Sequence, residues 1–176
     1  ELELETPKVG SQDVAKINGS VTFADVKFGY LKNQTIINDF NLHVHAGQTV
    51  AIVGPTGAGK TTIIKLLMRF YELNSGSIYI DGIDIRDFGR KDLRSLFGIV
   101  LQDTWLFNGT IKENLMYGKL NASDQEVKEA CKVAYADHFI QTLEDGYDTI
   151  INEESSNISQ GQKQLLTIAR AFLKDP

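Results

Sequence analysis

The chain has 176 residues, of which 42% are hydrophobic and 23% are charged, so it can form one globular domain with its own core. A net charge of −5 argues against a nucleic-acid-binding protein, because such domains usually carry a strongly basic face. No apolar run approaches the length of a membrane span, and a single cysteine excludes an internal disulfide.

The N-terminal part of the sequence predicts a linker followed by two strands. Residues 1–16 are polar and acidic with little periodicity, which is typical of a linker. Alternating apolar residues predict one strand over 21–28, interrupted by a bulge, and a second strand over 40–44. His43 and His45 share the polar face of the second strand and could ligate a metal. Because no third ligand is apparent, we interpret this face as solvated.

The most informative motif comes next. Residues 54–62 read Gly-Pro-Thr-Gly-Ala-Gly-Lys-Thr-Thr, which is a complete phosphate-binding loop. The apolar run 49–53 predicts a buried strand before it, and residues 63–70 predict a helix after it. Strand, loop and helix are the context that the motif requires. Glycines let successive backbone N–H groups point at one anion, and the helix start adds its own unpaired N–H groups.

The loop predicts how a nucleoside triphosphate and its metal are held. Lys60 can reach the β- and γ-phosphates and take part in catalysis, and the Thr61 hydroxyl can ligate Mg²⁺. The loop by itself leaves users of ATP and of GTP open. Its expected nucleotide-binding residues are Gly54, Pro55, Thr56, Gly57, Ala58, Gly59, Lys60, Thr61 and Thr62.

The segment that follows the loop predicts further strands. Residues 77–85 predict a hairpin, because their central Asp-Gly suits a two-residue turn that needs positive φ. Residues 97–101 form a short apolar run and predict a strand that ends at Gln102.

The second half of the chain predicts helices that begin with capping boxes. Such boxes start at Thr110, Ser123 and Ser159, and a further helix is expected over 136–143. Cys131 is expected to be a buried structural thiol in the helix after Ser123. The residues expected to face inward from that helix are Val127, Ala130, Val133 and Ala134.

Three features outside the loop narrow its function. Tyr30 lies at the end of the first predicted strand, where its ring could stack on adenine. The amide oxygen of Gln102 could complete Mg²⁺ coordination and orient a water molecule. The helix start at 158–162 offers a second anion-binding group. Its expected nucleotide-binding residues are Ser159, Gln160, Gly161 and Gln162.

In this order the motifs resemble the nucleotide-binding domain of an ABC transporter. Residues 54–62 match the Walker A motif, Gln102 the Q-loop, residues 158–162 the signature motif and Tyr30 the aromatic A-loop. The stretch 102–115 resembles the exporter branch of the family, in which a membrane domain precedes the ATPase on the same chain.

This resemblance implies a fold and an organisation. The expected fold is α/β, a P-loop NTPase core with an N-terminal antiparallel β subdomain and an inserted α-helical subdomain. The resemblance covers residues 17–176, places the helical subdomain at about 103–158, and makes residues 1–16 the linker from a membrane domain.

The resemblance also implies an activity, ligands and partners. It implies an ATPase that binds ATP and Mg²⁺ and drives transport at the cytoplasmic face of the cell membrane. The expected partners are a second nucleotide-binding domain, held head to tail, and the transmembrane domain of the same transporter, with no nucleic acid.

The sequence departs from the family pattern at three places. The signature begins with Ile158 where Leu is usual, and it has Gln160 where Gly is common. The residues before it, 152–156, lack the glycines of many exporters, which puts in doubt how closely this loop communicates with membrane helices. The family's Mg²⁺-supporting Asp and water-polarising Glu follow an Asp-Pro turn, and this chain ends at residues 175–176 with that pair.

We therefore expect both ends of the chain to be cut and the 176 residues to be inactive as an ATPase. We also expect exposed apolar surface and strand edges, so that the chain is poorly stable or associates. Two alternatives stay open. The chain could bind nucleotide without hydrolysis, or it could belong to a non-transport ABC ATPase, although the long insertions or second domain of such proteins do not occur in these residues.

Overall fold

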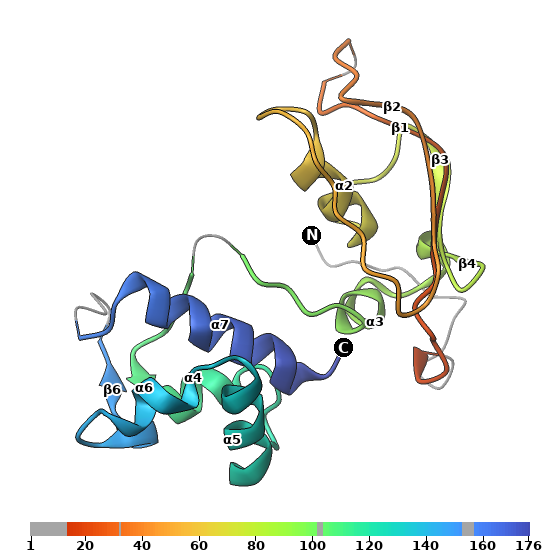
Figure 1. The fold of residues 1–176 in the computed structure, drawn as a ribbon. Helices are drawn as coiled ribbons and strands as arrows, with labels where there is room; N and C mark the ends of the chain where they lie inside the picture. Colours follow the sequence, from red (N-terminus) through yellow and green to blue (C-terminus); the bar gives the residue numbers. More distant parts are fainter. Residues whose placement is uncertain (1–13, 32, 102–103, 153–156) are drawn as a thin grey trace. The chain divides into compact units, whose positions relative to one another are not determined.

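The computed structural model describes residues 14–31, 33–101, 104–152 and 157–176 (Figure 1). The chain divides into two compact units, Glu1–Phe97 and Gly98–Pro176. The first is rich in strands and the second in helices. Among the helices in the described ranges, we find none with the length and apolar character needed to cross a membrane.

A four-stranded antiparallel sheet forms the centre of the first unit. Its strands lie in the order β2-β1-β3-β4. Register shifts within β1, together with a φ of 50° at Asp25, confirm the predicted bulge. The bounds of the strands are Val21–Phe28 for β1, Ile37–Val44 for β2, Ser75–Ile80 for β3 and Ile83–Asp84 for β4.

The helix after the phosphate-binding loop, α2 (Lys60–Leu67), shares one core with this sheet. Ile63 and Leu66 of the helix are buried together with apolar residues of β1 and β3. The chain then continues through η1 (Ile85–Asp87) to a short helix, α3 (Arg90–Ser95). The buried apolar residues of this core are Phe23, Val26, Phe28, Ile37, Ile63, Leu66, Ile78, Ile80, Ile85, Phe88 and Leu93.

The predicted hairpin is confirmed by the turn between β3 and β4. Asp81 and Gly82 have φ values of 48° and 80°, as a two-residue turn of this type requires. The Asp81 carboxylate also accepts hydrogen bonds from the backbone N–H groups of Asn18, Gly19 and Ser20. Burial acts to raise the pKa of Asp81, but a hydrogen bond from the Ser20 hydroxyl and these backbone bonds together lower it. The turn thereby anchors the segment that leads into β1.

Two predicted strands are wrong. Residues 49–53 and 97–101 take no strand conformation, and neither segment pairs with a strand among the described residues. Their side chains are correspondingly open, with Val53 87% and Leu101 62% exposed. A strand exists only through hydrogen bonds to a neighbour, so an apolar run is not sufficient to form one. The helix predicted over 63–70 also ends earlier, because Arg69 takes a φ of 54°.

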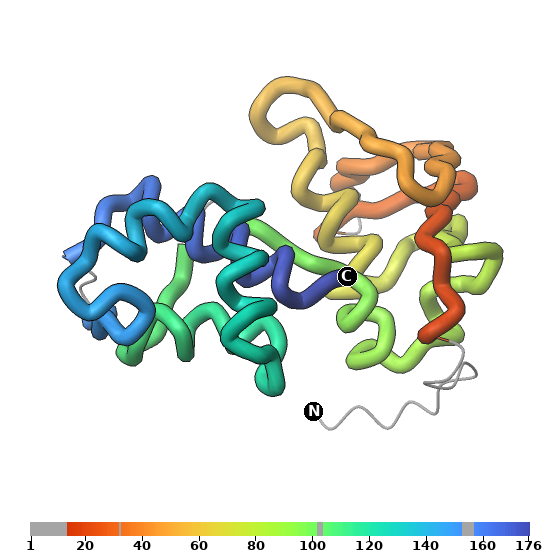
Figure 2. The backbone as a smooth tube through the Cα atoms, turned by 60° about the horizontal axis from the view of Figure 1, so that its bottom comes forward, coloured from red at the N-terminus to blue at the C-terminus, as the bar shows by residue number. Residues whose placement is uncertain are grey.

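Four helices and a small antiparallel pair of strands make up the described part of the second unit. In Figures 1 and 2 the longest helix, α7, runs beside α4 and α5, and it packs against both. A core of buried apolar residues joins them, including Ile111, Leu115, Ile140 and Leu166. The helices are α4 (Ile111–Met116), α5 (Asp124–Val133), α6 (Asp137–Gln141) and α7 (Gln160–Lys174), and β5 (Gly109–Thr110) pairs with β6 (Ile150–Ile151), which follows η2 (Gly146–Asp148).

All three predicted capping boxes are present. The hydroxyls of Thr110, Ser123 and Ser159 accept from the backbone N–H three residues on, at 3.0, 3.3 and 3.2 Å. In return, the side chain at that third position accepts from the N–H of the capping residue in each box. Each box satisfies donors that a helix start otherwise leaves unpaired.

The inward face of α5 differs from the prediction at one residue. Val127, Ala130 and Ala134 are buried as expected, whereas Val133 is 56% exposed. Cys131 takes the inward position and is fully buried, which confirms the predicted structural thiol. Burial raises the pKa of the Cys131 thiol to about 11, against a smaller lowering by a hydrogen bond with Tyr147. The thiol is therefore protonated at neutral pH.

Candidate nucleotide-binding site

The phosphate-binding loop runs from residue 54 to the start of α2 and turns tightly at two glycines. Gly57 and Gly59 both have a φ of 85°, which favours glycine. Gly59 is also the N-cap of α2, and a Cβ built there would lie 2.8 Å from Cδ1 of Ile37. The loop conformation therefore depends on contact with the start of β2, a segment distant in sequence.

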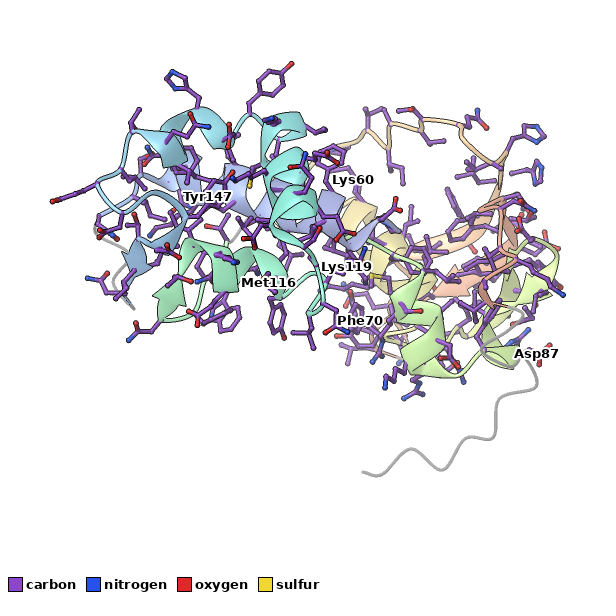
Figure 3. The ribbon with its side chains drawn as sticks, turned by 90° about the horizontal axis from the view of Figure 1, so that it is seen from below. Lys60, Phe70, Asp87, Met116, Lys119 and Tyr147 are labelled. Carbon is purple, nitrogen blue, oxygen red and sulfur yellow. The ribbon has the colours of Figure 1, made fainter. Side chains whose placement is uncertain are left out.

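Lys60 places its charge across this loop. Its Nζ donates hydrogen bonds to the backbone carbonyls of Gly54 at 2.7 Å and Pro55 at 2.8 Å. The labelled side chain lies at the start of α2 in Figure 3. The ammonium, the helix start and the turned loop backbone together form a positive concavity of the kind that binds phosphate.

The two threonines after Lys60 differ in their surroundings. Thr61 is exposed, whereas Thr62 is 6% exposed and its Oγ1 lies 3.2 Å from the phenol oxygen of Tyr30. A hydroxyl at the edge of a phosphate cradle suits Mg²⁺, which prefers oxygen ligands and keeps most of its waters. Thr61 therefore fits the predicted metal role. Gln102, the other predicted metal ligand, lies outside the described residues.

An aromatic cluster lies beside the first turn of α2. The Tyr30 ring is 45% exposed and makes edge contacts with Phe28 and with Tyr71, at centroid distances of 5.0 and 5.1 Å. The sequence predicts that Tyr30 stacks on adenine, but it does not identify Tyr71 as a neighbour of Tyr30. The only sequence signal for Tyr71 is an aromatic residue just after the predicted helix, and its partner Tyr30 lies before that helix and before the phosphate-binding loop.

The second predicted anion-binding group lies in the helical unit. Ser159 caps α7, and Ile158 beside it is buried in the core of the unit, with 5% exposure. Gln160 donates from Nε2 to Oγ1 of Thr104 at 3.1 Å. Gly161 is exposed, and a Cβ built on it meets no atom within 4 Å. Gln162 completes the capping box. The first N–H groups of a helix have no intrahelical partners, so this start can accept an anion.

An exposed aromatic cluster occurs on the same unit. Trp105, Phe107 and Tyr117 have ring centroids 6.0 to 6.2 Å apart. The guanidinium of Arg170 lies 5.4 Å from the centroid of Tyr117 and donates to the carbonyl of Trp105 at 3.2 Å. The buried Asn114 fixes Phe107 by accepting from its N–H at 3.0 Å and donating to its carbonyl at 2.9 Å. Trp105 and Tyr117 remain 62% and 61% exposed.

The histidine pair of β2 does not form a larger metal-ligand group. The rings of His43 and His45 lie 4.6 Å apart, and Nδ1 of His43 lies 2.7 Å from Oγ1 of Thr22. Within the described part of the chain, no three or more acidic, histidine or cysteine side chains lie together in a group that could hold a metal ion.

The sequence profile of the ABC transporter family matches residues 37–176. An ABC transporter ATP-binding protein of Bacillus subtilis, YfiC, is 57% identical over 158 residues, which cover 90% of this chain and 26% of that protein. A fatty acid ABC transporter ATP-binding/permease protein of Mycobacterium bovis is 52% identical, with 93% and 26% covered. The chain thus spans about a quarter of the length of these relatives.

A solved structure supports the same assignment. The structure of a bacterial Atm1-family ABC exporter with ATP bound matches with a TM-score of 0.88 and 44% identity, covering 98% of this chain and 29% of that one. The sequence identity and the structural similarity to this exporter therefore both agree with the match to the family profile. The chain belongs to the ABC transporter family, as an ATP-binding domain of the exporter type.

Proposed function

We propose that this domain binds ATP with Mg²⁺ and couples the nucleotide to transport across a membrane, as part of an exporter. The geometry of residues 54–62 carries this proposal. Lys60 crosses a loop turned by Gly57 and Gly59, and the helix start and Thr61 lie beside it. In this proposal the loop amides and Lys60 hold the β- and γ-phosphates, and the Thr61 hydroxyl joins the coordination of Mg²⁺.

The binding step can be tested by removing the positive charge of Lys60. Lys60→Ala should abolish measurable ATP binding in calorimetry, because the phosphates lose their nearest cation. Lys65→Ala is the matched control, since Lys65 is an exposed lysine on the same helix. Equal affinity of the parent chain and Lys60→Ala for ATP would contradict the proposed site.

We propose further that two such domains face each other head to tail, with the loop of one and the α7 start of the other around each ATP. The open surroundings of Gly161 support this arrangement, because they leave room for a triphosphate to approach the helix start. Because a Cβ at Gly161 meets no atom within 4 Å, Gly161→Glu should keep the fold, and its carboxylate should repel the phosphates. ATP-induced dimers should then disappear in analytical ultracentrifugation, while Gln164→Glu, an exposed position on the same helix, should keep them.

The proposed contact with the transmembrane domain is the cluster of Trp105, Phe107 and Tyr117. Trp105 and Tyr117 are exposed and Phe107 is half-buried, and contacts with Asn114 and Arg170 hold the cluster in place, as expected of a preformed docking surface. In this proposal the domain lies at the cytoplasmic face of the membrane. In the whole transporter, Trp105→Ser should lower transport while ATP affinity stays unchanged. Unchanged transport would contradict the contact.

Hydrolysis by the 176 residues alone is a separate question. The family resemblance places the water-polarising Glu after an Asp-Pro turn, and not in the loop or at the signature helix. We therefore propose that these residues hold ATP without turning it over. Steady release of phosphate from MgATP by the purified chain, lost in Lys60→Ala, would refute this point while leaving the binding proposal intact.

A further inference from the structure

Tyr71 belongs to an aromatic cluster with Phe28 and Tyr30, the residue proposed to stack on adenine. Its ring meets that of Tyr30 at a centroid distance of 5.1 Å and an interplanar angle of 81°. Both rings also contact Phe28, at 5.0 Å for Tyr30 and 5.7 Å for Tyr71. Edge-to-face contacts of this kind are favourable because the positive edge of one ring meets the negative face of another.

One ring of the cluster is buried in the core, and the other two rings are partly exposed. Phe28, at the end of β1, is 4% exposed and belongs to the core of the unit. Tyr30 and Tyr71 keep 45% and 43% of their surface exposed. The phenol oxygen of Tyr30 also lies 3.2 Å from Oγ1 of Thr62, in the first turn of α2. The Tyr30 ring is therefore held from several sides while much of it stays accessible.

We propose that Tyr71 is a positioning residue for the purine base of the nucleotide. It holds the Tyr30 ring in the orientation in which a base can stack, so that less rotamer freedom is lost on binding. This inference rests on the proposed function, in which Tyr30 stacks on adenine. Because Tyr71 acts through the ring that is proposed to stack on the base, replacing it should change the affinity for ATP. The affinity for a triphosphate without a base should stay the same.

The inference can be tested by comparing two ligands that share a triphosphate. Calorimetry on the 176-residue chain would measure MgATP and inorganic tripolyphosphate, which has no base. Tyr71→Ala should weaken MgATP about three- to tenfold, the range expected for one aromatic pair, and leave tripolyphosphate unchanged. Tyr71→Phe should restore ATP affinity, because the ring contact is kept. Phe70→Ala is the matched control, since Phe70 is the adjacent exposed aromatic residue and its ring contacts Arg94 instead.

The controls separate the possible failures. Tyr71→Leu keeps bulk without a ring, and it should reproduce the selective loss if Tyr71→Ala folds poorly. An equal loss of both ligands in Tyr71→Leu, or no loss of either, would overturn the role of Tyr71. If the parent chain binds neither ligand, the proposed nucleotide site itself is wrong. If Tyr30→Ala leaves MgATP affinity unchanged, the stacking role of Tyr30 fails, and the role of Tyr71 fails with it.

Discussion

The two units of this chain differ in how far their structure depends on residues distant in sequence. In the helical unit, Gly98–Pro176, three helices begin at the residues that their capping boxes predict. In the strand-rich unit, Glu1–Phe97, the apolar run 49–53 forms no strand, although it precedes the phosphate-binding loop as the motif requires. A capping box is complete within four residues, whereas a strand needs a partner.

The same distinction divides the candidate site. The start of α7 is built by Ser159 and Gln162, which are three residues apart. The start of α2 has no side-chain cap, and its N-cap Gly59 packs against Ile37 and Ile36 instead. The conformation of the loop at 54–62 therefore depends on the sheet, whereas the start of α7 depends mainly on residues of its own first turn. Substitutions in each unit can test this contrast.

The largest effect is expected at Gly59. Gly59→Ala forces an L residue to a φ of 85° and places a Cβ 2.8 Å from Ile37. Backbone strain and overpacking together should lower the free energy of unfolding by about 2–4 kcal/mol in urea denaturation. Gly161→Ala makes the same change at the other helix start, where the Cβ meets open space. Equal destabilisation by both substitutions would remove the contrast between the two helix starts.

The next effect is expected at Asn114, the buried polar residue of the helical unit. Asn114→Ala leaves the N–H and carbonyl of Phe107 without their side-chain partners. The free energy of unfolding should fall by about 1–3 kcal/mol, and hydrogen exchange should rise at Phe107. Asn121→Ala, at an exposed loop position, is the control. No change in exchange at Phe107 would show that this contact is not needed to order the segment.

A smaller and more local effect is expected at Ser123. Ser123→Ala removes the hydroxyl that accepts from Glu126 N–H and should cost about 1 kcal/mol. Amide exchange should increase in the first turn of α5 and stay unchanged in α7. Ser123→Thr keeps the hydroxyl and should behave like the parent chain. Loss of protection throughout the helical unit would mean that the cap acts beyond its own helix.

The smallest effect is a dependence on pH at Glu126. The Lys119 ammonium, followed by the N–H and hydroxyl of Ser123, holds the pKa of Glu126 at about 2, below its ordinary 4.5. Because the folded-state pKa is lowered, this stabilisation is complete above pH 4.5 and is lost as pH falls toward 2. Glu126→Gln keeps the cap geometry but should reduce the change of melting temperature with pH between about 4.5 and 2. Glu129→Gln should leave this pH dependence as it is in the parent chain.

Much of the fold could be predicted from sequence, for identifiable physical reasons. The β3–β4 turn follows from Asp81-Gly82, and the helix starts follow from their capping residues. Two outward residues, Val133 and Phe172, show the limit, since an apolar side chain at a helix position does not reveal what covers it. Exposure depends on packing between elements, which periodicity alone does not specify.

The candidate site was predictable where its residues are contiguous. The motif at 54–62 and the cap at Ser159 are visible in the sequence because each is complete within a few residues. Tyr71 and the contact between Gly59 and Ile37 were not visible, because they join segments brought together by the sheet and α2. The predicted role of Gln102 lies outside the described residues and stays a prediction.

Hydrogen exchange of residues 54–62 with and without MgATP tests most directly whether this loop holds the nucleotide. We expect MgATP to slow exchange of the amides in this loop in the parent chain and in Lys65→Ala, but not in Lys60→Ala. Tripolyphosphate should produce the same slowing, since the loop holds phosphates and not the base. Exchange in residues 54–62 that stays unchanged at saturating MgATP, with binding detected elsewhere in the chain, would show that this loop is not the phosphate site.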